Sequence, residues 1–171
     1  MKYTGYRMKE INMKFTEGYW EKSERANASH AMHAFVVEEI PNGMRVIAPF
    51  HKINDRADAL DVGTITTEFT ATRKDIISVR SWHFEGYQKK EPRFELNTDV
   101  QDVTVKINDK EAVMTAGRMQ VIVDREEFKI TYMADGKVLT TCGFRNLGYM
   151  QYDRECLTKF PQENYMAARY T

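Results

Sequence analysis

The feature that most constrains the fold of this chain is a series of short period-two runs between residues 65 and 149. In one run the apolar or β-branched residues Ile65, Thr67 and Phe69 alternate with polar neighbours, and residues 102–107, 119–123 and 128–132 repeat the pattern. Successive side chains of a β-strand point to opposite faces, so each run places one face against a core and the other toward solvent. The sequence therefore predicts many short strands.

Turn residues divide these strands into hairpins. Residues 32–50 contain two β-rich arms around Pro41-Asn42-Gly43, where Asn-Gly is expected to supply the positive φ angles of a tight turn. Asp135-Gly136 is expected to turn a second hairpin over residues 127–142. Further strands are expected within residues 75–84, 100–107, 112–116 and 118–124. Residues 51–62 predict an exposed loop or one short helical turn.

Together these patterns indicate an all-β chain with little helix, folded as an antiparallel β-sandwich, because two sheets must cover each other's apolar faces. A barrel is the alternative. Parallel βαβ units are disfavoured because their crossovers need a dozen or more residues. At 171 residues and 20.0 kDa the chain suits one domain over residues 13–171, preceded by a polar extension over residues 1–12.

Charge and cysteine content restrict the partners. The 25 basic and 25 acidic residues cancel, so no long-range field attracts nucleic acid or an anionic membrane. No segment has the pattern of a signal peptide or a membrane span, and a cytoplasmic location is expected. Cys142 and Cys156 are then expected to be reduced, partly buried thiols, without a nearby histidine to activate either one.

Several polar groups have spacings that resemble metal or catalytic sites. His30 and His33 have a spacing that could hold a metal on a helix, but a strand-prone context favours surface or loop histidines. His83 and Glu85 lack the PCxxC partner of zinc deaminases, and His83 is expected to be a hydrogen-bonded, half-buried core residue. The three-residue spacing of the aspartates in residues 51–62 does not fit a calcium loop: Asp55, Asp58 and Asp61.

Adjacent carboxylates do not form an acid and base pair either. Neighbours on a strand face opposite ways, which separates Glu38 from Glu39 and Glu126 from Glu127. Exposed aromatic residues could stack on sugar rings, but packing inside the sandwich or between domains is favoured for Trp20, Trp82, Tyr87, Tyr149 and Tyr152. Trp82 shares a mixed face with Arg80, whose stem could lie over an aromatic ring.

In order and spacing, six short motifs resemble the amino-terminal domain of α-xylosidases in glycoside hydrolase family 31. They are MKFTEGYW, VRSWHFEG followed by FELN, DVTVKI, and NLGYMQ followed by NYM, and they extend from about Met13 to Ala168. The resemblance implies a galactose mutarotase-like β-sandwich that precedes a (β/α)8 barrel in a retaining α-glycosidase acting on α-linked xylosides or glucosides. Residues 1–12 depart from the family pattern.

The resemblance also implies that the chemistry lies elsewhere. Family members use two aspartates of the barrel, one as nucleophile and one as acid, and a barrel needs about 250 residues. We therefore expect no catalytic, cofactor-binding or metal-binding residue in this chain, and no turnover by it alone. The expected role is a non-catalytic domain that docks on the barrel of a larger glycosidase and supports its substrate entrance.

Two other roles stay open. A stand-alone carbohydrate-binding module would use exposed aromatic residues, and an oligomerisation module would use apolar surface or strand edges that are otherwise uncovered. Because such surface and edges would be uncovered, the isolated chain is expected to associate with itself as a homo-oligomer.

Overall fold

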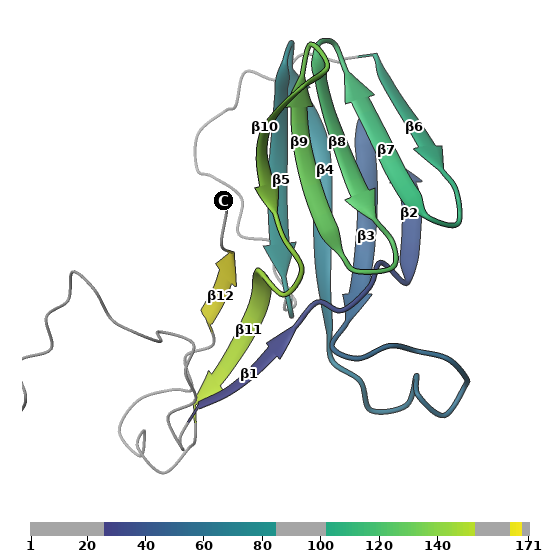
Figure 1. Ribbon diagram of the computed structural model, residues 1–171, viewed down its shortest axis with the longest axis vertical. Coiled ribbons are helices and arrows are strands. Elements are labelled where there is room, and N and C mark those ends of the chain that lie inside the picture. The colour runs from purple at the N-terminus through teal and green to yellow at the C-terminus, as the bar shows by residue number, and fades with distance from the viewer. Residues whose placement is uncertain (1–25, 85–101, 153–164, 169–171) are drawn as a thin grey trace, which may run out of the picture.

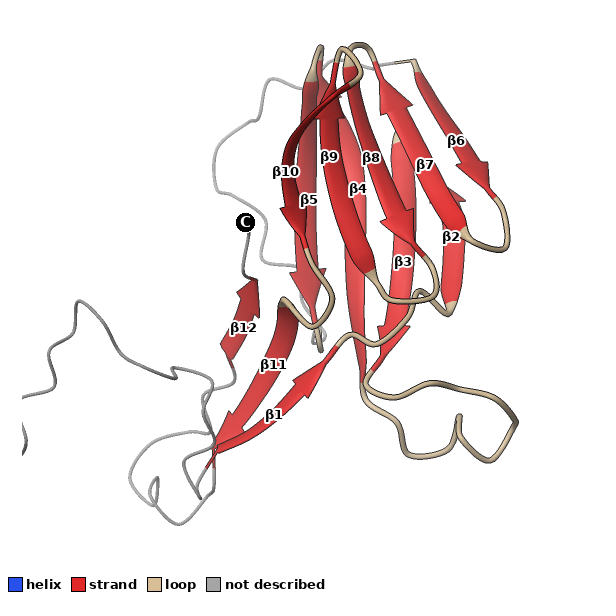
Figure 2. Cartoon of the chain, in the orientation of Figure 1, coloured by secondary structure: helices blue, strands red, loops and turns tan. Residues whose placement is uncertain are grey.

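The computed structural model describes residues 26–84, 102–152 and 165–168, and within these ranges it contains strands and turns without any helix (Figure 2). The strands form three sheets, and every strand pair is antiparallel (Figure 1). Two of these sheets stack face to face. The prediction of an all-β antiparallel sandwich is confirmed.

The first sheet of the sandwich has four strands in the order β2-β3-β4-β5. Their bounds are β2 Val36–Ile40, β3 Gly43–Pro49, β4 Thr64–Arg73 and β5 Ile76–Trp82. Along β4 buried and partly buried residues alternate almost without a break, and Ile65, Thr67 and Phe69 are fully buried. The run that predicted this strand therefore has its expected face toward the core.

The second sheet has five strands in the order β10-β9-β8-β7-β6 and lies in front of the first in Figure 1. Their bounds are β6 Val103–Ile107, β7 Glu111–Ala116, β8 Met119–Asp124, β9 Lys129–Ala134 and β10 Lys137–Cys142. A bulge interrupts the pairing of β10 with β9 between Val138 and Thr140. These strands match the predicted ones, apart from residues 100 and 101, which lie outside the described ranges.

A third, smaller sheet was not predicted. It has the order β1-β11-β12 and lies beside one end of the sandwich (Figure 1). Its strands are β1 Ala26–His30, β11 Leu147–Tyr152 and β12 Tyr165–Ala168. The sequence ANASH of β1 has no apolar alternation, so it lacks the pattern that predicted the other strands. The backbone of β1 pairs with β11 along its whole length.

The core lies between the two large sheets. One sheet contributes Met44, Val46, Ile65 and Phe69, and these pack in one cluster with residues of the other sheet: Ala112, Met114, Val121, Val123, Ile130 and Tyr132. Interdigitation of two apolar inner faces is the usual source of stability in a sandwich. The outer faces of both sheets are therefore left to contact another protein or a ligand.

The two predicted hairpin turns differ in outcome. Asp135 and Gly136 turn β9 into β10 with φ angles of 50° and 75°, as predicted for a two-residue turn that needs two positive φ angles. Between β2 and β3 the turn residues are instead Pro41 and Asn42, because Ile40 pairs with Gly43. Only Asn42 has a positive φ angle, 59°, so the predicted Asn-Gly turn is wrong by one residue.

Gly43 is required for another reason. A Cβ atom on Gly43 would overlap the carbonyl oxygen of Phe69 on the neighbouring strand β4. Gly43 thus lets two backbones approach, a common use of glycine within strands.

Arg125 joins the two large sheets at one end of the sandwich. Its guanidinium donates hydrogen bonds to the carbonyl oxygens of Asn108 at 2.7 Å, Ala34 at 3.4 Å and Phe35 at 3.4 Å. Its backbone carbonyl accepts a bond from the N–H of Ala34 at 2.9 Å. One side chain therefore links the β6–β7 turn and the β8–β9 turn to the segment that enters β2.

Candidate functional surfaces

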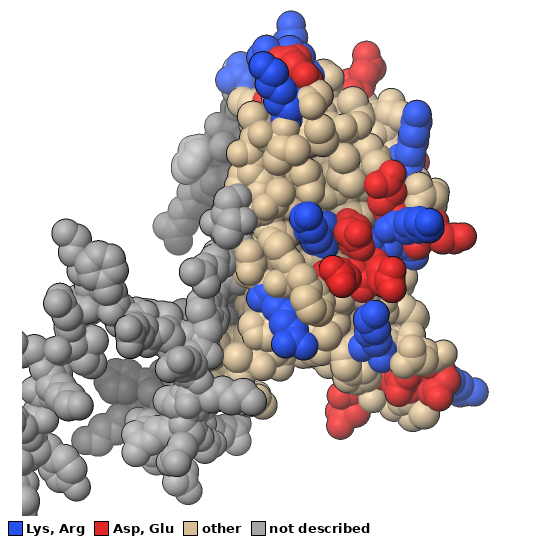
Figure 3. Space-filling model, in the orientation of Figure 1, with Lys and Arg blue, Asp and Glu red and all other residues tan. Residues whose placement is uncertain are grey.

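The outer face of the β6–β10 sheet has an uncharged middle on its three central strands, bounded at one end by the charged row Glu111, Asp124 and Lys129. The outward positions there pair across the strands as Thr115, Gln120 and Met133 and, in the next row, Val113, Ile122 and Thr131. All six side chains are partly exposed. Figure 3 views this face and shows charged side chains near its two ends with an uncharged area between them.

The outer face of the β2–β5 sheet has a different pattern. Strand pairing arranges its outward residues in three rows, each of which crosses all four strands. In order from β2 to β5, the rows are Val36, Ile47, Thr66 and Trp82; Glu38, Arg45, Glu68 and Arg80; and Ile40, Gly43, Thr70 and Ser78. The first row is mainly apolar, and the second alternates in charge. We call these rows the apolar row and the charge ladder.

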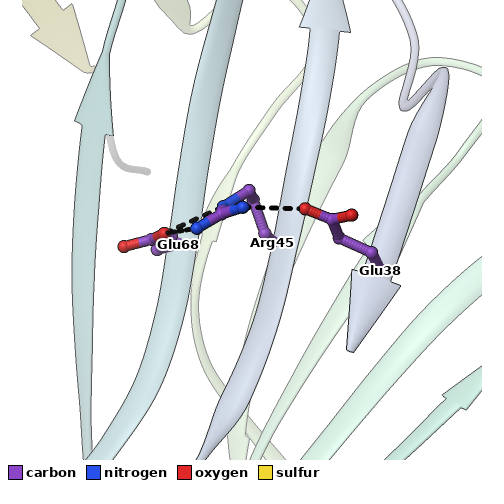
Figure 4. Close-up of polar contacts among 3 residues, drawn as sticks. All are labelled: Glu38, Arg45 and Glu68. Carbon is purple, nitrogen blue, oxygen red and sulfur yellow. Dashed lines mark hydrogen bonds and ion pairs between the residues drawn. The ribbon is translucent and has the colours of Figure 1, made fainter. Parts of the chain in front are cut away.

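Arg45 is the centre of the charge ladder. It donates from Nε at 2.9 Å and from Nη2 at 2.7 Å to Oε1 of Glu68, and from Nη1 at 2.9 Å to Oε1 of Glu38 (Figure 4). The hydrogen bonds to Glu68 and then to Glu38 raise the pKa of Arg45 above its ordinary value. Three strands are thus connected by one cation on a partly exposed surface.

Trp82 ends the apolar row on the edge strand β5. The guanidinium carbon of Arg80 lies 4.8 Å from the centre of the Trp82 ring, which confirms the expected cation–π contact. The indole is partly exposed. Of the other aromatic residues considered for sugar stacking, Trp20 and Tyr87 and the side chain of Tyr152 lie outside the described residues.

Tyr149 and His83 belong to a packed aromatic cluster with Phe50. The ring centres of His83 and Tyr149 are 4.2 Å apart, and Phe50 lies 5.3 Å from His83 and 6.1 Å from Tyr149. Nδ1 of His83 bonds to the carbonyl oxygen of Thr64 at 2.8 Å, which confirms its predicted half-buried, hydrogen-bonded state. Burial raises the pKa of Tyr149. The cluster joins β11 to the β2–β5 sheet, so it packs elements together.

His33 lies in the loop between β1 and β2, as predicted, whereas His30 is the last residue of strand β1. Both side chains are partly buried, and neither Nδ1 atom has a hydrogen-bond partner among the described residues. Desolvation is the main cause that lowers the pKa of each ring, and the charge of Arg145 near His30 adds to it. No group of three or more histidine, cysteine or acidic residues in the described part of the chain could hold a metal ion.

The acidic loop binds its own backbone. Oδ1 of Asp55 accepts bonds from the N–H groups of Ala57 and Asp58, at 2.7 and 3.2 Å. Oδ2 of Asp58 accepts from the N–H of Asn54 at 2.9 Å, and this bond is the main cause of the lowered pKa of Asp58. These carboxylates therefore stabilise the loop. Asp61, the third aspartate of the loop, has a positive φ angle of 59°.

The remaining candidates do not assemble into a site. Glu126 and Glu127 lie in the β8–β9 turn rather than on a strand, where their N–H groups donate to Oδ1 of Asp124 at 2.9 and 3.0 Å. Cys142 is a buried free thiol whose pKa is raised to about 11 by burial. Glu85 and Cys156 lie outside the described residues. Among the described residues, no helix is long and apolar enough to span a membrane.

Comparison with known proteins finds a sequence relative for part of the chain. No protein-family model matches the chain. The α-xylosidase XylQ of Lactiplantibacillus pentosus is 28% identical over 129 residues, which cover 75% of this chain and 17% of that protein. The chain thus corresponds to less than a fifth of this much longer relative.

A solved structure has the same fold. The cycloalternan-forming enzyme of Listeria monocytogenes, determined with a pentasaccharide substrate, matches 73% of this chain and 11% of its own chain, with a TM-score of 0.55 and 10% identity. At that identity the match concerns the fold alone. The sequence match supports the resemblance that the short motifs indicated, to the amino-terminal domain of glycoside hydrolase family 31 enzymes, and the structural match shows that the fold is shared.

Proposed function

We propose that this chain is the non-catalytic amino-terminal domain of a family 31 α-glycosidase, where it docks on the catalytic (β/α)8 barrel and supports the substrate entrance. The observation that carries the proposal is its homology to a 17% portion of an α-xylosidase. The substrates of the larger enzyme would be terminal α-linked xylosides or glucosides, and its location would be the cytoplasm.

The charge ladder is unsuited to glycosidase chemistry. A retaining glycosidase needs two carboxyl groups about 5–5.5 Å apart, of which one begins the reaction protonated. Glu38 and Glu68 instead both accept hydrogen bonds from Arg45, so a guanidinium lies between the two carboxyl groups (Figure 4).

The uncharged middle of the outer face of the β6–β10 sheet is the surface that we assign to docking. The cores of protein interfaces are depleted in charged residues, and Val113, Ile122 and Met133 form such a centre between charged ends. In the barrel-bearing enzyme, Ile122→Lys would place an ammonium group there, whereas Ser78→Lys, on the opposite outer face, is the matched control.

Two measurements test the proposal. The purified 171-residue chain should not hydrolyse aryl α-xylosides or α-glucosides, and turnover that follows the protein through purification would refute a non-catalytic role. Expressed separately, the chain should co-purify with the remaining part of the enzyme. Ile122→Lys should abolish this binding and Ser78→Lys should retain it; the reverse pattern would contradict the assigned docking face.

A carbohydrate-binding role is the second candidate, and the partly exposed ring of Trp82 beside Arg80 favours it. Xyloglucan fragments or xylose-containing disaccharides would then quench tryptophan fluorescence with saturation, and Trp82→Ala would remove the quench. A saturable quench that survives Trp82→Ala would place any sugar elsewhere.

A further inference from the structure

The order of charges on the outer face of the β2–β5 sheet is self-complementary. From β2 to β5 the charge ladder reads negative, positive, negative, positive, through Glu38, Arg45, Glu68 and Arg80. When such a series meets its own copy in reversed order, each charge faces an opposite charge. When it meets the copy in the same order, each charge faces its like.

A two-fold axis produces this reversed order when it runs parallel to the strands in the plane between the two facing sheets, at a position midway between β3 and β4. It brings Glu38 opposite Arg80 of the copy and Arg45 opposite Glu68 of the copy. Because this axis keeps each row opposite the same row, the apolar row also meets itself. Trp82 then faces Val36 of the copy, and Ile47 faces Thr66.

The two rows would contribute in different ways. Val36 is 36% exposed, and its burial with Ile47 and Trp82 removes apolar surface from water. The ladder charges keep their bonds within one chain, since Arg45 already contacts both glutamates (Figure 4). Their opposition across the interface fixes the orientation of the copies more than it adds affinity.

We propose that the outer face of the β2–β5 sheet binds the same face of a second copy of this chain, about a two-fold axis that runs along the strands between β3 and β4. The contact is isologous, so each pairing across it occurs twice. Aligned packing of two sheets face to face is a common arrangement of β-proteins. The proposal is independent of the docking role assigned to the β6–β10 sheet.

Charge reversal followed by mixing tests this arrangement. Arg45→Glu places a carboxylate opposite Glu68 of the copy, and Glu68→Arg places a guanidinium opposite Arg45 of the copy, so each variant alone should be monomeric in sedimentation equilibrium. An equimolar mixture should form a heterodimer, because every opposed pair is then of opposite charge. Circular dichroism melts verify that each variant is folded, and a folding defect would not be repaired by mixing.

Site-specific crosslinking tests the register. Chains with Ile47→Cys and Thr66→Cys, mixed and treated with a short bis-maleimide, should give a 47–66 product in preference to 47–47 and 66–66 products. The unsubstituted chain controls for its own cysteines, of which Cys142 is buried. A preference for the same-residue products would overturn the axis.

Matched substitutions separate this face from the opposite one. Ile47→Lys should weaken dimerisation about tenfold or more, which is about 1.4 kcal/mol or more, while Ile122→Lys on the β6–β10 face should leave it unchanged. A chain that stays monomeric at high concentration, or a dimer sensitive only to Ile122→Lys, would overturn the proposal. Either result leaves the catalytic assays of the proposed function unaffected.

Discussion

Arg118 binds Asp75 across the two large sheets at the end of the sandwich opposite to Arg125. The backbone N–H of Arg118 donates to Oδ1 of Asp75 at 2.9 Å, and its Nε donates to Oδ2 at 3.2 Å. Asp75 lies in the β4–β5 turn and Arg118 in the β7–β8 turn. A Cβ atom on Gly117, which has a φ angle of 59°, would lie 2.6 Å from Oδ1 of Asp75, so this close approach requires glycine.

The Arg118–Asp75 contact should make the stability of the sandwich depend on acid pH. The backbone hydrogen bond from Arg118 is the main cause that lowers the pKa of Asp75 below 3.8. A carboxyl with a lowered pKa in the folded state contributes stability above its unfolded value, and this contribution is lost as pH falls through the folded value. Asp75→Asn should therefore lower the melting temperature at neutral pH and flatten its decline below 3.8.

Thermal melts of the unsubstituted chain and of Asp75→Asn over this acid range provide the measurement. Asp109→Asn is a suitable control, because Asp109 is exposed in the β6–β7 turn. Parallel declines for the unsubstituted chain and Asp75→Asn would contradict a role of this contact in stability.

Period-two alternation was sufficient to predict the sandwich, because each strand of the two large sheets has one buried face. The runs around Phe69 and Val121 illustrate this, since both side chains are fully buried. The third sheet escaped prediction for the opposite reason. Strand β1 consists of small and polar residues, and backbone pairing with β11 defines it.

The charge ladder could have been predicted only with the correct register of the first hairpin. The observed pairing of Ile40 with Gly43 sets Glu38 opposite Arg45. The expected turn at Asn42-Gly43 would instead have set Ile40 opposite Arg45. A slip of two residues keeps each side chain on its face, so burial alone could not reveal the error.

Gly43 and Gly136 should respond differently to replacement by alanine. A Cβ at position 43 would overlap the Phe69 carbonyl, so Gly43→Ala should force β3 and β4 apart at a cost of about 3 kcal/mol. Gly136 has a φ angle of 75° and no heavy atom of the described residues within 4 Å of the added Cβ, so Gly136→Ala should cost about 1 kcal/mol from backbone strain. Urea unfolding of the two variants measures both costs, and equal losses would contradict this account of Gly43.

Cys142 should be unreactive in the folded chain. Its thiol is 2% exposed, and burial raises its pKa to about 11, so little of the nucleophilic thiolate is present near neutral pH. In a Cys156→Ser background, labelling with a chromogenic disulfide should be slow for the native protein and fast in urea. Rapid labelling without urea would show that the end of β10 opens readily.

His30 and His33 should make the sandwich less stable in mild acid. Both rings have a pKa below 6.5, chiefly because burial disfavours the imidazolium. Nearby charge lowers each pKa further, from Arg145 at His30 and from Lys52, His51 and Arg125 at His33. As pH falls below 6.5, the two imidazoles are protonated in the unfolded chain before they are protonated in the folded chain. The stability that the neutral rings provide is therefore present above 6.5 and is lost as pH falls through their lowered folded values.

Urea unfolding at a series of pH values on both sides of 6.5 should show this loss. The double variant His30→Gln/His33→Gln should lose less stability over the same interval, because it removes both titrating groups. His51→Gln alone should change the pH dependence less than the double variant, because the charge of His51 lowers the pKa of His33 only after burial and Lys52. If the double variant and the unsubstituted chain keep the same pH dependence, the enclosed imidazoles do not determine it, and protonation would have to act at other residues.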